Sequence, residues 1–475
     1  MRKISTTEGS SVREANSPQE AGRCEGKIFG TDGIRDIVNH GFLKSAFLDK
    51  LGRVIGSNIH ADGHAPRVII GRDTRPSGAM IEKILSGALA SVGMNVDSAG
   101  VISTPGLAYL AKCGKYAVGV MISASHNPSN YNGIKLFGPD GLKMTNSIEE
   151  KMERQIRAGV RPRRSVLKGV FSDMVEAELA GKYINDTPKI ILGAKVNILS
   201  SRVRIVLDCA NGALAEIAPA IFSRTGAAII PINHKADGDN INCRCGSLYP
   251  EALRRKVLAT KACIGFSFDG DGDRVIMADE KGNIRDGDFV LYIAAGYLKK
   301  RGLLRNNTVV GTVMTNSALE NTLVRQGVKL VRTPVGDKYV LDEMLRGGFS
   351  IGGEPSGHVI FSDYSKNGDG VITALMMLKI MAAENKTLWQ LAQGLVKYPQ
   401  IIVNVPVKSR PPLEEIKPIK ESADRIHKIL HNQGRLVLRY SGTENLCRIM
   451  IEGQSFPYIK SLANKLAVVI KKELG

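Results

Sequence analysis

The chain has 475 residues, of which 43% are hydrophobic and 23% charged, and its formal net charge is +19. This length exceeds what one hydrophobic core usually organises and predicts two to four domains. No apolar run approaches the roughly 20 residues of a membrane-spanning helix, so we expect no membrane association. Abundant glycine and few aromatic residues favour an α/β protein over a β-sandwich.

The first 26 residues are polar and lack the apolar segment of a secretory signal. We expect them, residues 1–26, to form a disordered extension outside the folded domains. The seven cysteines are scattered along the chain, and Cys243 and Cys245 form a single C-x-C pair without a second pair. A zinc site is therefore not expected, and reduced thiols predict a cytoplasmic protein.

The densest basic cluster contains Arg161, Arg163, Arg164 and Lys168. It has no aromatic residue on which a nucleic-acid base could stack, and no known nucleic-acid-binding module surrounds it. We interpret the cluster as a solvated face or linker and expect no nucleic-acid partner. The positive charge of the chain is compatible with attraction of phosphorylated substrates.

Apolar runs alternate with amphipathic stretches through most of the chain. Residues 67–93 read as a buried strand, a polar loop and a helix that ends at Gly93. Residues 117–128 read as a strand and a loop. Residues 202–233 form a strand–helix–strand pattern, and residues 307–337 repeat it. This alternation predicts mixed, mostly parallel sheets covered by helices on both faces.

The pattern changes near residue 400. An alternating strand is followed by a helix around residues 419–431, then by two strands that flank a polar loop, and finally by a terminal helix. This order predicts an α+β domain of different topology. We therefore expect three similar α/β domains over 27–170, 171–283 and 284–398, and an α+β domain over 399–475.

A loop rich in turn-forming residues follows the strand that ends near residue 122, and it contains Ser125. The serine could act as a nucleophile or phosphoryl carrier, or it could be a cap in an ordinary polar loop. A hydrolase triad is disfavoured, because the segment has no G-x-S-x-G motif. His126 is also the immediate neighbour of the serine, which is a poor position for its base.

An acidic loop follows the apolar run that ends at residue 268. Its carboxylates Asp269, Asp271 and Asp273 alternate with glycines, so that one short loop can direct several oxygens toward a hard cation such as Mg²⁺. An EF-hand would share this spacing, with Glu280 at its last position. However, Arg274 stands where that loop needs glycine, and a strand precedes the loop in place of a helix. A solvated loop is the remaining alternative.

A glycine-rich turn presents Glu354, Ser356 and His358. A carboxylate, a hydroxyl and an imidazole in this arrangement suit hydrogen bonding to the hydroxyl groups of a sugar. The alternative interpretation is an ordinary turn.

The polar loop of the last domain combines Arg439, Ser441, Gly442 and Thr443, with Arg448 beyond it. Guanidinium and hydroxyl groups around a permissive glycine can bind an anion such as phosphate. A plain hairpin turn is the alternative when this loop is considered alone. Together, the four loops combine a phosphoryl carrier, a metal site, a sugar site and a phosphate site.

These segments, "ISASHNP", "FDGDGDR", "GEPSGH" and "RYSGTE", resemble in content and order the signature loops of the α-D-phosphohexomutase superfamily. "DCANGALAEIAP" and "DGDNINCRCGSLYPE" are similar to the bacterial phosphoglucosamine mutase branch. The resemblance runs from residue 27 to the C-terminus. It implies four domains around a central cleft, three alike in α/β topology and a fourth that is distinct.

The resemblance also implies a role for each residue of the four loops. The phosphoserine would be Ser125, and Mg²⁺ would be held by Ser125, Asp269, Asp271 and Asp273. Contacts to sugar hydroxyls would come from Glu354 and Ser356. The non-reacting phosphate would be bound by Arg439, Ser441, Gly442, Thr443 and Arg448. The catalytic cleft would be lined by the basic residues Arg35, Lys135, Arg274 and His358.

The implied reaction interconverts glucosamine 6-phosphate and glucosamine 1-phosphate, and it feeds the synthesis of amino-sugar nucleotides and cell-wall precursors. One phosphate cannot pass directly between O6 and O1, because both oxygens cannot lie in line with the same phosphorus. Such an intramolecular phosphotransferase, an isomerase, therefore works through a phosphoserine and a 1,6-bisphosphate. It needs a source of phosphate that activates Ser125 and a general base, for which Lys135 and His358 are the candidates.

Two alternatives stay open at this point. Phosphomannomutase or phosphoglucomutase activity would use the same four loops on a different sugar. A non-catalytic sugar-phosphate-binding protein would belong to a different functional class, but it would be expected to lose the serine or the aspartates. The sequence leaves the oligomeric state open and is compatible with a homodimer.

Overall fold

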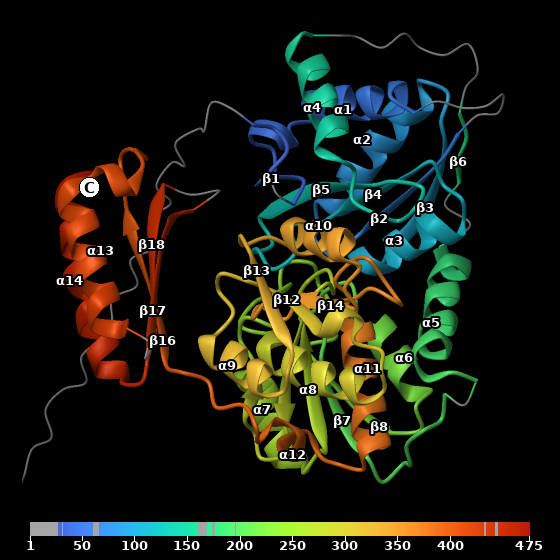
Figure 1. Ribbon diagram of the computed structural model, residues 1–475. Helices are drawn as coiled ribbons and strands as arrows, with labels where there is room; N and C mark the ends of the chain where they lie inside the picture. Colours follow the sequence, from blue (N-terminus) through green and yellow to red (C-terminus); the bar gives the residue numbers. More distant parts are fainter. Residues whose placement is uncertain are drawn as a thin grey trace, which may run out of the picture.

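The computed structural model describes residues 27–30, 32–59, 66–159, 169–172, 176–194, 196–431, 434–441 and 445–475 (Figure 1). The proposed N-terminal extension, the basic cluster at 161–168, Gly442 and Thr443 lie outside these residues. None of the helices in the described part is both long enough and apolar enough to cross a membrane.

The first α/β unit is built on a mixed sheet with the strand order β1-β5-β4-β2-β3-β6. Its strands are β1 (Ile34–Ile37), β2 (Arg67–Arg72), β3 (Asn95–Val101), β4 (Val118–Ile122), β5 (Tyr131–Phe137) and β6 (Phe171–Ser172). Its helices are η1 (Gly41–Leu43), α1 (Ser45–Ser57), α2 (Gly78–Ala90), α3 (Thr104–Cys113) and α4 (Asn146–Arg157). Both faces of the sheet are buried: Val68 and Ile70 of β2 pack in the core that contains α1 and α2, whereas Ile69 packs with α3.

The second unit has the sheet order β11-β10-β9-β7-β8, in which β7, β8 and β9 are parallel and β10 is antiparallel. The strands are β7 (Arg204–Asp208), β8 (Ala228–Ile232), β9 (Ile264–Phe268), β10 (Val275–Asp279) and β11 (Ile284–Arg285). The helices are α5 (Glu176–Leu192), α6 (Ile217–Ser223) and α7 (Glu251–Thr260). Helix α5 contacts α3, α6 and α11, and it therefore links the first unit to the two that follow.

The third unit has the sheet order β13-β12-β14-β15. Its strands are β12 (Thr308–Thr312), β13 (Lys329–Thr333), β14 (Ile351–Gly353) and β15 (Val359–Phe361). Its helices are α8 (Gly287–Lys300), η2 (Arg305–Asn307), α9 (Ser317–Arg325), α10 (Asp337–Gly347), α11 (Gly370–Glu384) and α12 (Leu388–Ala392). Residues on all sides of α11 are buried, as expected for a helix enclosed between layers.

The fourth unit is an antiparallel sheet covered by helices on one face. Its strands are β16 (Gln400–Pro406), β17 (Gly434–Tyr440) and β18 (Leu446–Gly453), in the order β16-β18-β17. Its helices are η3 (Leu413–Glu415), α13 (Lys417–Leu430) and α14 (Phe456–Leu474). Alternate strand residues, such as Ile449 and Ile451, form a core with these helices. The opposite face of the sheet is turned toward the rest of the molecule (Figure 1).

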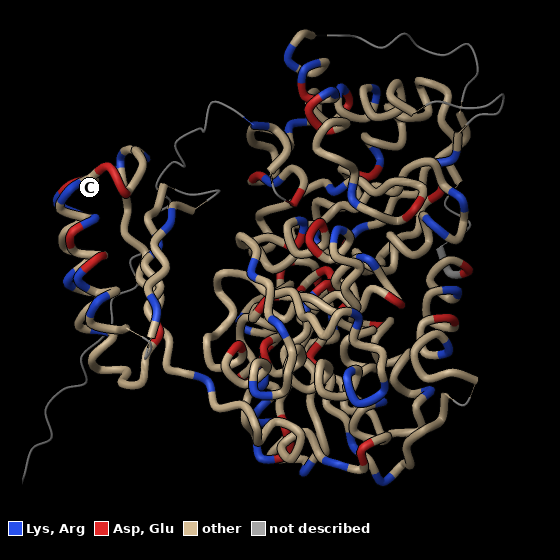
Figure 2. Tube along the Cα trace, in the orientation of Figure 1, with Lys and Arg blue, Asp and Glu red and all other residues tan. Residues whose placement is uncertain are grey.

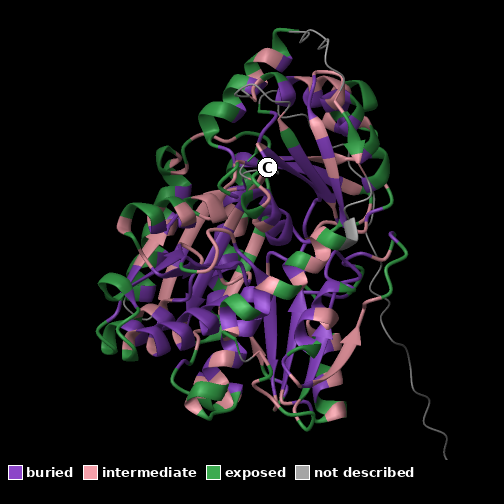
Figure 3. Ribbon diagram, turned by 90° about the vertical axis from the view of Figure 1, so that its right-hand side faces the viewer, coloured by how far each residue is buried: buried purple, intermediate pink, exposed green. Residues whose placement is uncertain are grey.

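The predicted fold class is confirmed, with three α/β units that contain mixed sheets and an α+β unit at the C-terminus. One continuous apolar cluster runs through the first three units, from Ile69 through Phe266 to Leu375, whereas the fourth unit has a core of its own. Figure 3 shows the buried strands at the centre of each α/β layer. The domain boundaries expected from the sequence stay predictions.

Candidate functional site

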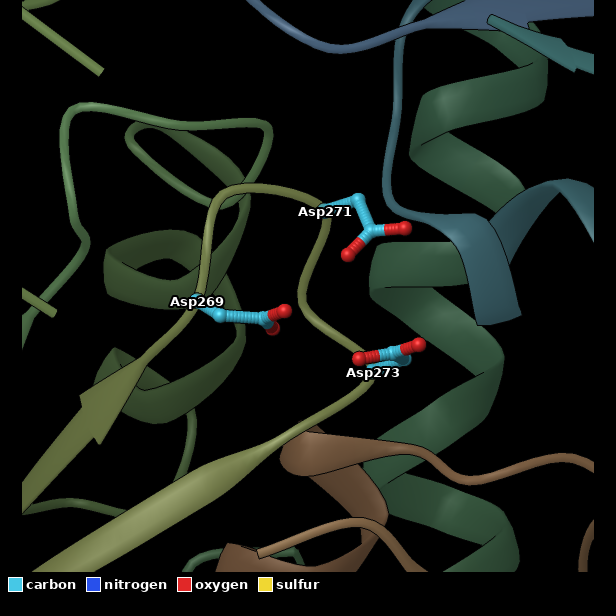
Figure 4. Close-up of side chains that lie close together, drawn as sticks. All are labelled: Asp269, Asp271 and Asp273. Carbon is cyan, nitrogen blue, oxygen red and sulfur yellow. The ribbon is translucent and has the colours of Figure 1, made fainter. Parts of the chain in front are cut away.

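The acidic loop connects two buried strands of the second unit. Strand β9 delivers Asp269, and antiparallel β10 leaves the loop at Val275, so the chain reverses within a few residues. Gly272 permits this reversal with a φ of +74°. As a result, Asp269, Asp271 and Asp273 are all buried and each can offer an oxygen within 4.8 Å of the others. Figure 4 shows the three carboxylates turned toward a common space.

Ser125 reaches this loop from the first unit. It follows β4, is fully buried, and has a φ of +53°, a left-handed conformation that is uncommon for residues other than glycine. Its Oγ atom donates a hydrogen bond of 2.7 Å to Oδ2 of Asp269. The structure thus places the predicted phosphoryl carrier against the predicted metal loop, across 144 positions of sequence.

The left-handed turn at Ser125 is held by a buried arginine. Arg75 donates from Nη2 to the carbonyl oxygens of Ser125 (3.0 Å) and Asn127 (2.8 Å), and from Nη1 to that of Tyr131 (2.9 Å). Its Nε atom donates to Asp73 at 2.9 Å, and both side chains of this ion pair are completely buried. Strained backbone persists where surrounding groups over-determine it, as they do here.

Asn242 of the second unit also forms hydrogen bonds with this turn. The Asn242 side-chain amide donates to the carbonyl oxygens of Ser125 (2.9 Å) and Asn127 (3.1 Å). No motif in the sequence pointed to Arg75, and the segment "DGDNINCRCGSLYPE", which contains Asn242, gave that residue no role. Both act on backbone carbonyls, and this role leaves no pattern of residue types in the sequence.

The electrostatics of the loop fit a cation. Burial raises the pKa of Asp269 well above its usual value, and the nearby Asp273 and Asp271 raise it further. Burial alone would also raise the pKa of Asp271, but Lys135 and the Thr104 hydroxyl together bring it below its usual value. Three carboxylates in one buried place are unfavourable without compensating positive charge.

The oxygen atoms of the acidic loop and of Ser125 are suited to bind a hard divalent cation. Oδ1 of Asp271 and Oδ1 of Asp273 are buried and have no hydrogen-bond partner among the described residues. Buried polar atoms are rarely left in that state, and a metal ion would satisfy both. The three carboxylates and the Ser125 hydroxyl offer oxygen atoms only, the ligands that Mg²⁺ prefers. The residues present therefore fit a bound metal ion.

Basic residues surround the serine and the acidic loop. Lys135 is buried, with Nζ at 2.9 Å from Asp271 and 3.0 Å from Asp32. Although burial favours the neutral amine, Asp271 and Asp32 raise the pKa of Lys135 above its usual value. Arg35 pairs with Asp32 and donates to Asn127 Oδ1 at 3.2 Å. Burial alone would lower the pKa of Arg274, but the nearby carboxylates of Asp273 and Asp269 raise it above its usual value.

A row of ion pairs, Asp32–Lys143–Asp337, links the first and third units beside these basic residues. No motif in the sequence indicated these ion pairs. The Lys143 ammonium pairs with both carboxylates. A cavity of about 290 Å³ adjoins it, lined in part by Thr104, Asp273 and His358. Several acidic and basic positions gather in this central region (Figure 2).

The predicted sugar loop lies next to the acidic loop. Glu354 Oε1 accepts a hydrogen bond of 3.0 Å from the backbone nitrogen of Gly336, and the Ser356 hydroxyl donates to Oε2 at 3.3 Å. His358 forms a backbone bridge with Arg274, which fixes the two loops side by side. Its Nε2 atom is 3.8 Å from Asp337. The structure thus brings Glu354, Ser356 and His358 together with the acidic loop.

The fourth unit presents a pair of arginines. Arg439 of β17 and Arg448 of β18 are directly opposite in the antiparallel register, on the sheet face away from α13 and α14. Like charges directly opposite are unfavourable in a sheet, and a bound anion would relieve the repulsion. Burial and Arg448 lower the pKa of Arg439, whereas Glu354 raises it. Ser441 is buried at the end of β17.

Sequence models of the phosphoglucomutase/phosphomannomutase family match the chain in four consecutive parts. The matches cover α/β/α domain I at residues 26–162, domain II at 182–282, domain III at 286–398 and the C-terminal domain at 402–468. Together they include all four loops of the candidate site.

Two relatives are similar along almost the whole chain. A phosphoglucosamine mutase from Thermoanaerobacter pseudethanolicus is 42% identical over 452 residues, which cover 94% of this chain and 100% of the relative. A phosphoglucosamine mutase from Halalkalibacterium halodurans is 43% identical over 453 residues, which cover 95% and 99%.

Solved structures share the fold. A phosphoglucomutase/phosphomannomutase family protein from Burkholderia thailandensis has a TM-score of 0.76 at 23% identity, covering 94% of this chain and 97% of that chain. The Aspergillus fumigatus N-acetylphosphoglucosamine mutase, solved with GlcNAc-6P and magnesium, has a TM-score of 0.64 at 18% identity, covering 94% and 96%. Domain matches and full-length relatives agree, and the chain belongs to the phosphoglucomutase/phosphomannomutase family and, within it, to the phosphoglucosamine mutases.

Proposed function

We propose that this protein is a phosphoglucosamine mutase that interconverts glucosamine 6-phosphate and glucosamine 1-phosphate through phosphorylated Ser125 and a 1,6-bisphosphate. The contact between the Ser125 hydroxyl and the buried aspartate triad carries the proposal, because a phosphoryl carrier must lie beside the cation that stabilises its charge. The 42% identical relative of the same name supports the choice of sugar.

Mg²⁺ is the metal we propose, held by Asp269, Asp271, Asp273 and an oxygen of phosphorylated Ser125. When bound, it supplies positive charge that stabilises the transferring phosphoryl group. The protein contributes a buried, oxygen-only cradle whose ends are fixed by two antiparallel strands.

The basic residues near the serine have a complementary role. Lys135, Arg35 and Arg274 would place positive groups around the reacting phosphoryl group. The burial of Lys135 strengthens its effect by excluding water. Complete burial of Ser125 also keeps water away from the phosphoserine, whose hydrolysis would inactivate the enzyme. Of the two candidates for the general base, His358 would accept the proton of the attacking sugar hydroxyl, because Asp271 and Asp32 raise the pKa of Lys135 and keep it protonated.

The loop of Glu354 and the loop of the fourth unit would bind the parts of the substrate that do not react. Glu354 and Ser356 would contact sugar hydroxyls. The non-reacting phosphate would be bound by Arg439, Ser441, Gly442, Thr443 and Arg448. Since the 1,6-bisphosphate must present each phosphate in turn to Ser125, these contacts have to accept the sugar in both orientations. The reaction is nearly symmetric, so one site would serve both orientations.

A second function within the same family is phosphoglucomutase or phosphomannomutase activity. The names of the matching domain models favour keeping it as the alternative. A cytoplasmic location, an activating phosphate donor for Ser125 and a homodimeric state stay predictions.

A substrate panel tests the proposed function. We expect kcat/KM for glucosamine 6-phosphate to exceed that for glucose 6-phosphate and for mannose 6-phosphate, measured on the same enzyme preparation activated with the matching 1,6-bisphosphates. A higher kcat/KM for glucose 6-phosphate or mannose 6-phosphate would establish the alternative function instead.

Replacement of Ser125 by alanine should abolish turnover, because the phosphoryl carrier is lost. The fold should stay intact. Intact-mass measurement should find one phosphate on the native chain and none on Ser125→Ala. Ser147→Ala, an exposed serine on α4, is the matched control and should keep both the phosphate and the activity. Turnover by the purified Ser125→Ala enzyme would refute the assignment.

Asp271→Asn should weaken metal binding, because it removes one of three anionic ligands and leaves the Lys135 ammonium with less negative charge around it. We expect activity to require at least about 10-fold more Mg²⁺ in a titration of rate against metal concentration. Asp49→Asn, on the exposed side of α1, should leave the titration unchanged. An unaltered metal requirement in Asp271→Asn contradicts the metal site.

Arg75→Lys should lower kcat by about 100-fold or more, because a lysine keeps the charge but cannot hold several carbonyls of the serine turn at once. Arg53→Lys is the control, since Arg53 makes a similar side-chain pair with Asp49 on the surface of α1. Steady-state rates and circular dichroism would separate loss of the turn from loss of the fold. A folded Arg75→Lys enzyme with native kcat would show that the arginine does not position Ser125.

A further inference from the structure

A buried carboxylate joins the fourth unit to the third. Glu452, near the end of β18, is 0% exposed, and its Oε1 atom accepts hydrogen bonds from the backbone nitrogen of Ser317 (3.1 Å) and from Nε of Arg435 (3.1 Å). The Ser317 hydroxyl also donates to Oε1. Because Ser317 is the first residue of α9, its backbone N–H belongs to the N-terminus of a helix, where a negative charge is favoured.

Arg435 makes a second link across the same boundary. Its Nη2 atom donates to the carbonyl oxygen of Thr315 at 2.9 Å. Arg332 of the third unit donates to the same carbonyl at 2.7 Å. Arg435 and Glu452 therefore both form hydrogen bonds with the segment 315–317. We call this set of contacts the Glu452 anchor.

The anchor shares a strand ladder with the arginine pair of the candidate phosphate site. In the register of β17 and β18, Arg435 is opposite Glu452, and Arg439 is opposite Arg448. Both pairs lie on the sheet face that is turned away from α13 and α14. Arg448 and Glu452 are four residues apart along one strand, a separation of about 13 Å. A rotation of the ladder at the anchor therefore displaces the arginine pair.

The segment that connects α12 to β16, residues 393–399, is held at the same place. Tyr398 exchanges two hydrogen bonds with the side chain of Asn316, of 3.0 and 3.1 Å, and Lys397 pairs with the buried Asp288 at 2.7 Å. Linker and anchor thus meet around segment 315–317, at one edge of the fourth unit. Since this unit has a hydrophobic core of its own, its orientation depends on such boundary contacts.

We propose that Glu452 is a positioning residue for sugar-phosphate binding. The Glu452 anchor sets where Arg439 and Arg448 lie relative to Glu354 and Ser125, so that the phosphate site is oriented before substrate arrives. A protein that spends less time in the binding-competent orientation binds its ligand more weakly by that fraction. The inference rests on the proposed function only in taking the arginine pair as the phosphate site.

The test is kinetic. Glu452→Gln preserves the shape of the side chain and removes its charge, and Ser317→Ala removes one hydrogen bond to it. We expect KM for glucosamine 6-phosphate to rise about 5- to 10-fold in Glu452→Gln, with a smaller rise in Ser317→Ala and with kcat changed less than KM in both. In the double variant, KM should rise by less than the product of the two single effects, since both changes remove the same contact.

Glu384→Gln is the matched control, because Glu384 also accepts from two cations, Lys300 and Arg301, but on the surface of the third unit. It should leave KM and kcat unchanged. Folding is checked by circular dichroism, and if Glu452→Gln does not fold, Ser317→Ala and the milder Glu452→Asp carry the test. A native KM in the folded variants, or independent effects in the double variant, would overturn the proposal.

Failure of the proposed function gives a different result. If the native enzyme rejects glucosamine 6-phosphate but accepts glucose 6-phosphate, the sugar assignment fails, and the same variants are measured with glucose 6-phosphate. The positioning role of Glu452 then stands or falls on the KM values for that substrate alone.

Discussion

The structure depends on the accommodation of three buried carboxylates in a single short loop. Asp269, Asp271 and Asp273 are brought together by an antiparallel return between β9 and β10, and their mutual repulsion demands positive charge. Lys135 supplies part of that charge, at 2.9 Å from Asp271, and a metal ion fits the oxygen atoms that are left without hydrogen-bond partners among the described residues. The serine turn, the basic cleft residues and the sugar loop are all arranged around this concentration of charge.

The serine is placed by contacts to its backbone. Arg75 and Asn242, from the first and second units, both donate to the carbonyl oxygen of Ser125, while the side chain is left to face Asp269. This division leaves the hydroxyl available for chemistry and keeps the turn rigid. An apolar cluster that runs through the first three units supports these contacts and makes that part of the site preorganised.

The proposed phosphate site is built differently, because the fourth unit has a separate core. Arg439 and Arg448 belong to a sheet that meets the third unit through polar, partly buried contacts at 315–317. Polar boundary contacts between domains permit adjustment more readily than a shared apolar core does. The proposed reaction would benefit from that difference, because the 1,6-bisphosphate would have to be held in two orientations while Ser125 and the acidic loop stay in place.

The sequence by itself determined the fold class, the order of the elements and the four loops, because alternating strands and helices and short runs of chemically specific residues are local patterns. The spacing of the acidic residues at i, i+2 and i+4 is sufficient to indicate a metal loop. The tertiary structure decided which other groups meet them. No local pattern gave Asp32, Arg75 or Asn242 a role, because their roles depend on contacts between positions far apart in sequence. The anchoring of the fourth unit by Glu452 likewise required the structure, since burial and hydrogen-bond partners across a domain boundary are set by packing and not by residue spacing.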